Sequence, residues 1–168
     1  TDTRCREQAE RLKKERGEDI FARFKHCPDT IWTLPQLMWL RENRPETYSE
    51  AKKIMFAKDY VRHCFTGDFL TDRIEAQGSM LFDYDEEAWS DEYLGLAGLN
   101  KSNMPRVVNP SDFAGKVIAS AAADSGLKAG TPVIVGATDT AMEVFAAGAV
   151  KKGDMTVKLA TAGRICLI

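Results

Sequence analysis

The chain has 168 residues, of which 44% are hydrophobic and 29% are charged, so it is long enough and apolar enough to bury a core. Its 25 acidic and 23 basic residues give a net charge of -2, which excludes a strong overall attraction to nucleic acid or to an anionic membrane. No apolar run approaches the roughly 20 residues that cross a bilayer, and the N-terminus is too charged for a signal peptide. We therefore expect a cytoplasmic protein whose function depends on a local site.

The first third of the chain has the periodicity of helices. The charged stretch 3–16 predicts a surface helix that ends near Gly17. Thr33 is followed three residues later by Gln36, which is the spacing of a capping box. This spacing predicts that a buried helix begins at Thr33.

Pro45 can close that helix and open the next one, because its missing N–H does no harm in a first turn. The next helix is expected over residues 46–65 and ends at Gly67. Three- and four-residue spacings place one stripe of this helix toward a core. The stripe consists of Ala51, Ile54, Met55, Lys58, Val61, Arg62 and Phe65.

Turn-forming residues dominate the middle of the chain. Residues 66–89 are expected to form an irregular connection with one short extended piece at 80–82. Ser90 is placed to cap a short helix that ends near Leu96. Residues 99–116 are expected to form another loop.

An alternating α/β pattern begins at Lys116. It predicts, in order, a short strand after Lys116, an Ala-rich helix stopped at Gly126, a strand over 132–135, a helix that stops near Gly148 and a hairpin over 155–168. The strand at 132–135 is a continuous apolar run, which is typical of a strand buried on both faces.

The cysteines are scattered through a chain too large to need disulfide bonds, so we expect reduced thiols at Cys5, Cys27, Cys64 and Cys166. Two of them directly follow His26 and His63. Structural zinc ligands usually stand about two to four residues apart rather than side by side. We therefore interpret both pairs as packing residues and assign no metal site.

Asp139 is the most conspicuous candidate for chemistry, because it is a carboxylate set in an apolar stretch directly after the strand at 132–135. Ligands of open α/β sheets bind beyond the carboxyl ends of the strands. An ionised Asp there can accept a proton from a hydroxyl group. The alternative is that Asp139 or Thr138 only caps the helix that follows.

The turn "LATAGR" at 159–164 is a second candidate. A Thr hydroxyl and backbone N–H groups in such a turn can contact a phosphate group. An ordinary hairpin turn is the alternative. The sequence contains neither a Walker-type phosphate loop nor the glycine pattern of a dinucleotide site.

Five segments, taken in this order and at these separations, resemble the motifs of a known family. They are "KDYVRHCFTGDFLTD", "EAQGSMLFD", "WSDEYL", "GLKAGTPVIVGATDTA" and "GDMTVKLATAGR". The chain resembles the FGGY carbohydrate kinases, and most closely the xylulokinase-like members. "DTRC" at 2–5 is similar to the Asp-Thr-Arg element of the family. "LMWLRENRPE" is similar to its Trp-Leu-x-Glu helix, with Gln36 where Lys is usual.

The resemblance implies a partial actin-like, ribonuclease-H-like α/β domain, with a helical first half followed by strand, helix, strand and β-hairpin. Residues 1–115 would be mainly helices and loops, and residues 116–168 would form the α/β segment that carries the catalytic Asp. The first strands and the nucleotide domain of the family have no counterpart here. We therefore expect an excised part of the N-terminal domain, inactive in isolation.

The resemblance also implies roles for particular residues. Asp139 would be the catalytic base and would contact the sugar together with Thr140, which stands where the family commonly has Asn or Gln. Thr161 and Gly163 would contact the phosphates of ATP, with Mg²⁺ balancing their charge.

The phosphate turn departs from the family pattern, because Ala160 replaces its first Gly and Ala162 its Ser. A protein containing this chain would transfer the γ-phosphate of ATP to a sugar hydroxyl, with a ketopentose as the expected substrate. A kinase-like module that has lost activity and serves as a sugar sensor or interaction domain is the alternative. The sequence is compatible with a homodimer.

Overall fold

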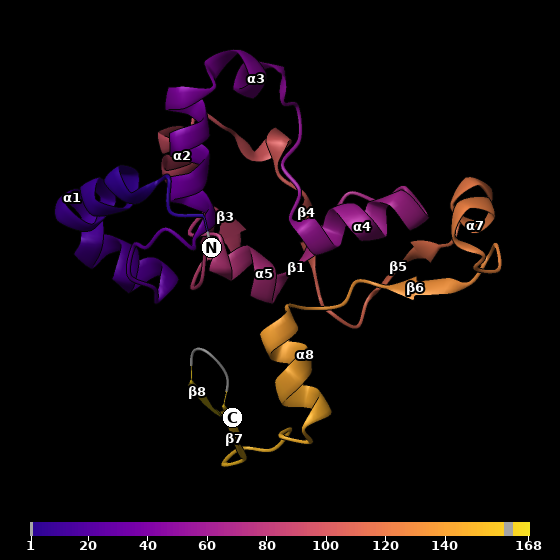
Figure 1. The fold of residues 1–168 in the computed structure, drawn as a ribbon. Helices are drawn as coiled ribbons and strands as arrows, with labels where there is room; N and C mark the ends of the chain where they lie inside the picture. The colour runs from indigo at the N-terminus through magenta and orange to yellow at the C-terminus, as the bar shows by residue number, and fades with distance from the viewer. Residues whose placement is uncertain (1, 160–162) are drawn as a thin grey trace.

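The computed structural model describes residues 2–159 and 163–168 and has the mixed α/β character that the sequence predicts (Figure 1). The helices are α1 (Arg6–Phe24), α2 (Thr33–Asn43), α3 (Pro45–Glu50), α4 (Ala57–Thr66), α5 (Arg73–Gly78), α6 (Asp91–Leu96), α7 (Ala119–Ser125) and α8 (Asp139–Ala146), with a 3-10 turn η1 at Lys101–Asn103. The strands are β1 (Leu70–Asp72), β2 (Phe82–Asp83), β3 (Ala88–Trp89), β4 (Arg106–Val108), β5 (Phe113–Lys116), β6 (Pro132–Ile134), β7 (Met155–Lys158) and β8 (Arg164–Leu167).

The strands pair two by two within the described residues. β1 is parallel to β4, whereas β2–β3, β5–β6 and β7–β8 are antiparallel pairs. The β7–β8 pair confirms the predicted strands of the hairpin. β6 lies beside β5 alone and Ile134 is 61% exposed, so the prediction of a strand buried on both faces is wrong for this chain.

The hydrophobic core lies among α1, α2, α5 and α6. Phe24 and Tyr93 meet edge to face with ring centroids 4.7 Å apart, and Phe82 meets Trp89 in the same way at 5.3 Å. Trp89 Nε1 also donates a hydrogen bond of 2.9 Å to the carbonyl oxygen of Pro105. Aromatic pairs of this kind add to the stability that burial of their area supplies, so the first pair joins α1 to α6 and the second joins β2 to β3.

Several predicted boundaries are confirmed. α2 begins at Thr33, and Pro45 opens α3 at its first position. Gly67 ends α4 in the left-handed conformation, with φ of 74°. Ser90 caps α6 by accepting a hydrogen bond from the amide of Tyr93. Each of these boundaries depends on a local backbone or capping preference, so it can be predicted without knowledge of distant contacts.

The predicted end of the first helix at Gly17 is wrong, because α1 continues to Phe24. The helix kinks at Arg16, where φ is -141°. Ile20 and Phe24 lie beyond the kink and are 0% and 2% exposed. Their burial against the core outweighs the low helix propensity of Gly17, since one Gly costs only about 1 kcal/mol.

The prediction of a capping box at Thr33 is also wrong. Trp32 is the N-cap residue of α2, and no side-chain cap hydrogen bond is present there. Gln36 instead donates to the carbonyl oxygen of Thr30. The helix therefore begins where the spacing predicts, but for a different reason.

The long helix expected over 46–65 is interrupted, since α3 ends at Glu50 and α4 begins only at Ala57. Its buried face also differs from the predicted stripe. Val61 is 57% exposed, whereas Asp59 and Arg62 are 0% and 6% exposed. Arg62 lies in the predicted stripe and is buried as expected, whereas Asp59 lies on the face that the pattern assigned to solvent and is buried as well.

Both stretches interpreted as loops contain regular structure. β1 and α5 lie in the first, and β4 lies in the second and pairs with β1. Asp72 begins α5, because its carboxylate accepts hydrogen bonds from the amides of Ile74 and Glu75. Strands of three residues held by a distant partner leave too little local pattern to recognise.

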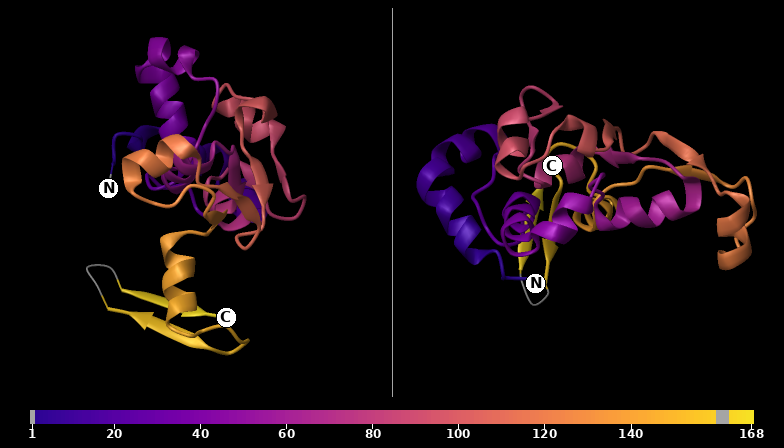
Figure 2. Two further views of the ribbon diagram at one scale, coloured as in Figure 1. Left: turned by 90° about the vertical axis from the view of Figure 1, so that its right-hand side faces the viewer. Right: turned by 90° about the horizontal axis from the view of Figure 1, so that it is seen from above.

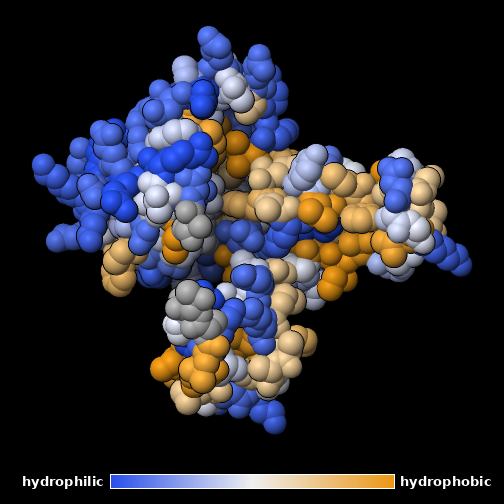
Figure 3. Space-filling model, in the orientation of Figure 1, coloured by the Kyte–Doolittle hydropathy of each residue, from blue (hydrophilic) through white to orange (hydrophobic). Residues whose placement is uncertain are grey.

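α8 leads away from the helical body to the β7–β8 hairpin (Figure 2). Apolar side chains are exposed over the arm formed by β5, β6 and α7 and over this hairpin (Figure 3). Phe113 and Ile134 on the first surface and Ile165 and Leu167 on the second are each more than half exposed. Contiguous apolar surface of this kind marks places where other parts of a protein pack. Among the described helices, none is long and apolar enough to cross a membrane.

Candidate active site

Asp139 is the first residue of α8 and lies beyond the carboxyl end of β6. Gly136 makes the turn between them possible, with φ of 77°, a conformation that other residues rarely adopt. Thr138 is the cap of α8, since its side chain accepts a hydrogen bond from the amide of Ala141. The capping role is therefore taken by Thr138, and the carboxylate of Asp139 is exposed.

Thr140 lies against this carboxylate. Its amide donates to Asp139 Oδ1 at 2.6 Å, and its hydroxyl approaches the same oxygen at 3.3 Å. Arg164 of β8 donates from Nη1 to the hydroxyl oxygen of Thr140. The structure thus adds a guanidinium group beside the two consecutive residues predicted to contact the sugar.

A cleft of about 220 Å³ separates α8 from the hairpin. Lys158 on β7 forms an ion pair with Glu143 on α8 at 2.7 Å across it. Gly163 is exposed, and among the described residues the nearest atom that a Cβ there would meet is the carbonyl oxygen of Lys158 at 4.0 Å.

The remaining residues of the predicted phosphate turn are Ala160, Thr161 and Ala162. They lie outside the described residues. The role of Thr161 therefore stays a prediction, as does that of Gly163.

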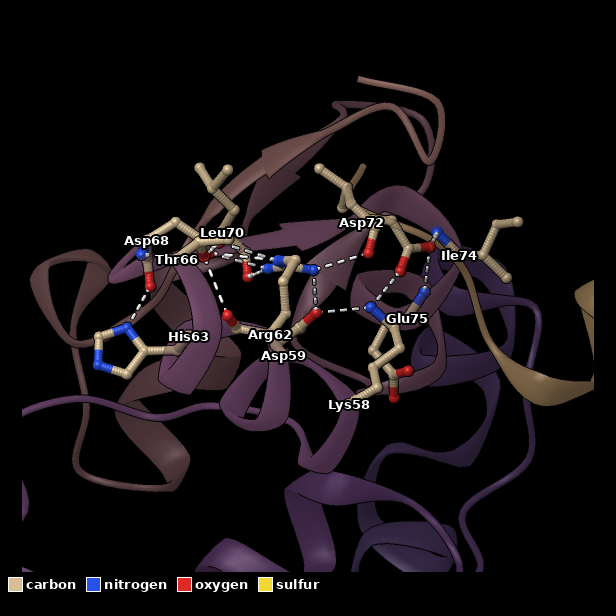
Figure 4. Close-up of polar contacts among 11 residues, drawn as sticks. Lys58, Asp59, Arg62, His63, Thr66, Asp68, Leu70, Asp72, Ile74 and Glu75 are labelled. Carbon is tan, nitrogen blue, oxygen red and sulfur yellow. Dashed lines mark hydrogen bonds and ion pairs between the residues drawn. The ribbon is translucent and has the colours of Figure 1, made fainter. Parts of the chain in front are cut away.

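Figure 4 shows a charged network that the sequence did not predict, and this network contacts the turn that leads to Asp139 through the carbonyl oxygen of Val135. It consists of Lys58, Asp59, Arg62, Asp68 and Asp72. Lys58 Nζ lies 2.6 Å from a carboxylate oxygen of both Asp59 and Asp72. The side chains of Asp59 and Asp72 are completely buried, so Lys58 compensates two carboxylates that water cannot reach.

Arg62 is the centre of this network. Its Nη1 donates to Asp59 Oδ1 and to the carbonyl oxygen of Val135, both at 2.8 Å. Its Nη2 donates to the carbonyl oxygen of Leu70 at 2.6 Å, and Nε and Nη2 each lie 3.1 Å from an oxygen of Asp68. One side chain therefore joins α4, β1 and the end of β6.

These contacts shift the pKa values of the groups involved. Burial alone would lower the pKa of Arg62, but hydrogen bonding to Asp68 and the charge of Asp59 raise it. Burial alone would raise the pKa of Asp68, but the hydrogen bonds from Arg62 and Thr66 lower it. Both groups are thus held in their charged forms.

Glu75 on α5 behaves differently, because burial raises its pKa and the charges of Asp59, Asp72 and Asp139 raise it further, against an opposing effect of Lys58. The charge of Asp139 thus acts on the same carboxyl group as the charges of Asp59 and Asp72 in the network.

Asp68→Asn should destabilise the protein by about 2 kcal/mol at pH 7, the contribution typical of a hydrogen bond to a charged group. Since the folded pKa of Asp68 is lowered, this contribution is present above the unfolded pKa of about 3.9 and is lost as pH falls below it. Thermal unfolding of parent and variant between pH 7 and pH 3 measures the difference in their stability at each pH. A difference in stability that stays constant down to pH 3 would contradict the assignment.

The sequence did contain signals for the network. Asp59 and Arg62 stand three residues apart, as an ion pair on a helix requires, and Asp72 with Glu75 has the spacing of a helix start. Their burial could not be read from this spacing, because exposed helix pairs have the same pattern.

The pairs formed by His26 and His63 with the cysteines that follow them remain unassigned to function. The interpretation of these pairs as packing residues is wrong for the cysteines, since Cys27 and Cys64 are exposed free thiols. Within residues 2–159 and 163–168, no three His, Cys, Asp or Glu side chains gather in a way that could hold a metal ion.

The chain matches the model of the N-terminal domain of the FGGY family of carbohydrate kinases over residues 1–146, and it therefore belongs to this family. The xylulose kinase of Lactococcus lactis is 28% identical over 162 residues, covering 96% of this chain and 32% of that protein. The L-fuculokinase of Escherichia coli K12 is 36% identical over 117 residues, covering 70% of this chain and 25% of that protein.

The structure of xylulose kinase from Rhodospirillum rubrum superposes with a TM-score of 0.90 at 27% identity, covering 96% of this chain and 33% of that one. This likeness confirms the prediction of a partial actin-like α/β domain. The chain spans about a third of the length of that kinase and of the Lactococcus lactis kinase.

Proposed function

We propose that this chain is part of an ATP-dependent sugar kinase that transfers the γ-phosphate of ATP to a hydroxyl group of a ketopentose. The observation that carries the proposal is the exposed carboxylate of Asp139, which lies beyond the end of β6 and is not used as a helix cap. Membership of the FGGY family supports a sugar as the acceptor. The names of the xylulose kinase relatives support a ketopentose.

In the proposed reaction, Asp139 accepts the proton of the sugar hydroxyl as that oxygen attacks the γ-phosphorus of ATP. A new P–O bond forms, the bond from the γ-phosphorus to the bridging oxygen breaks, and ADP leaves. Positioning and electrostatic stabilisation supply most of the rate enhancement in such transfers. Thr140 would fix the carboxylate through the contacts that its amide and hydroxyl make to Oδ1.

The turn at 159–164 would bind phosphate groups of ATP through Thr161 and Gly163. The basic residues Lys158 and Arg164 lie on the two strands that this turn connects, and such side chains suit an anionic group. Mg²⁺ would balance the phosphate charge when bound.

The test uses the full-length protein that contains these residues. It is incubated with MgATP and a panel of ketopentoses, deoxysugars, aldoses and polyols, and ADP formation and sugar binding are measured separately. The proposal expects sugar-dependent ADP formation that is fastest with a ketopentose. Sugar binding without turnover across the panel would contradict a kinase and favour the sensor alternative, while preference for another sugar would correct the substrate only.

A further inference from the structure

We infer that Arg62 is a positioning residue for the proposed base, and that it acts by holding the backbone of the turn that carries Asp139. The inference rests on the proposed function, but it concerns a residue of α4 that does not contact Asp139 directly. Arg62 donates from Nη1 to the carbonyl oxygen of Val135 at 2.8 Å. Val135 stands four residues before Asp139, at the point where β6 ends.

The turn is held from two sides. The loop before β5 supplies backbone bonds, from the amide of Val135 to the carbonyl of Asp112 at 3.0 Å and from the amide of Gly136 to that of Pro110 at 2.8 Å. Arg62 supplies a side-chain bond from α4, and among the described residues no other helix contributes one. Removal of Arg62 would leave the buried carbonyl group of Val135 without this donor.

Arg62 can fix a position because its own orientation is fixed. It is 6% exposed, and its guanidinium group is bound to Asp59, Asp68 and the carbonyl oxygen of Leu70. Asp59 is held in turn by Lys58, which also binds Asp72 at the start of α5. The network thus ties the turn before Asp139 to two other elements.

Stability alone gives a weak reason for such a network. Burial of four charged side chains beside the partly buried Lys58 carries a large desolvation cost, and apolar side chains of similar volume often stabilise a fold as well. What the charged network supplies is a defined direction for hydrogen bonds. Here that direction points at the backbone before the proposed base, where a displacement of about 1 Å can slow a reaction about 100-fold.

Arg62→Lys tests the inference in the full-length protein. Lys keeps one positive charge, but it cannot bind the carbonyl oxygen of Val135 and two carboxylates with one planar group. We expect kcat to fall about 30- to 100-fold while KM for sugar and for ATP changes less than about threefold. Amide exchange at Gly136 should rise about tenfold or more, because its protection depends on the same turn.

Gln8→Met is the control for a general loss of stability. Gln8 on α1 is 3% exposed and donates to Glu42 at 2.6 Å, so this variant also loses a buried hydrogen bond. It should lower the unfolding temperature without changing kcat or exchange at Gly136. Both variants are assayed at a temperature where circular dichroism shows them folded. If Arg62→Lys yields no soluble protein, Asp59→Asn, which keeps the side-chain size, replaces it, with an expected fall in kcat of about tenfold.

Unchanged kcat and unchanged exchange at Gly136 in the Arg62 variant would overturn the inference, as would an equal fall in kcat in Gln8→Met. If the parent itself phosphorylates no sugar, the proposed function fails instead. The exchange measurement then still decides whether Arg62 holds the turn, since it does not depend on activity.

Discussion

Asp139→Asn is expected to lower kcat for sugar-dependent ATP turnover by about 1,000-fold in the full-length protein. Asn keeps the shape of the side chain but cannot accept the proton of the sugar hydroxyl, and a general base contributes about 100- to 10,000-fold. KM for ATP should change little, because the carboxylate is proposed to act on the sugar. Steady-state kinetics with the best sugar of the panel measure both parameters.

Glu143→Gln is the matched control for this variant. Glu143 lies one turn further along α8 and is exposed, and its ion pair with Lys158 is of the surface type that contributes at most about 1 kcal/mol. The control should keep kcat within about threefold of the parent. A fall in kcat as large as that of Asp139→Asn would indicate that any loss of negative charge from α8 disturbs the site, and would contradict a specific role for Asp139.

Trp89→Ala is expected to destabilise the N-terminal domain by about 4 kcal/mol. The side chain is 8% exposed, packs edge to face on Phe82 and donates to the carbonyl oxygen of Pro105, so its loss leaves a cavity and a buried acceptor without its donor. The first thermal transition of the full-length protein should fall by about 10 °C.

Phe21→Ala serves as the comparison for this core variant. Phe21 lies on α1 and is 56% exposed, so its removal should shift the same transition by no more than about 2 °C. Equal shifts in the two variants would contradict the placement of the core between α1, α2, α5 and α6.

The parts of the fold that could be predicted are those with strong local signals. Pro45, Gly67, Ser90 and Gly126 each punctuate the chain by a backbone or capping preference that needs no distant partner, and each stands at the boundary that the sequence indicates. The helix after Asp139 was equally clear, because its cap at Thr138 and its apolar run agree.

The parts that could not be predicted depend on contacts between distant segments. β1 exists because β4, more than thirty residues away, pairs with it, and neither strand has a pattern of its own. Asp59 and Arg62 face inward because Lys58, Asp68 and Val135 receive them there. The spacing placed Lys58 and Arg62 on the core-facing stripe but assigned Asp59 to solvent, so it did not predict that charges of opposite sign are buried together.

The candidate site also contains residues that could be predicted from the sequence and residues that could not. The resemblance predicted roles for Asp139 and Thr140, which are neighbours in the sequence, and the structure adds the hydrogen bond from the amide of Thr140 to Asp139 Oδ1. Both roles stay predictions. Arg164 in contact with Thr140 could not be anticipated, because this contact depends on how the hairpin lies against α8. The charged network behind the turn was missed for the reason just given.

Single-turnover transfer of labelled γ-phosphate tests the central claim, that Asp139 is the base of a sugar kinase, most directly. Full-length parent and Asp139→Asn are each mixed with excess sugar and labelled ATP, and labelled sugar phosphate is followed in time, with the sugar Kd measured separately. The account predicts labelled sugar phosphate in the first turnover of the parent, and about 1,000-fold slower transfer in the variant at an unchanged sugar Kd. Equal transfer rates in the two proteins would contradict it.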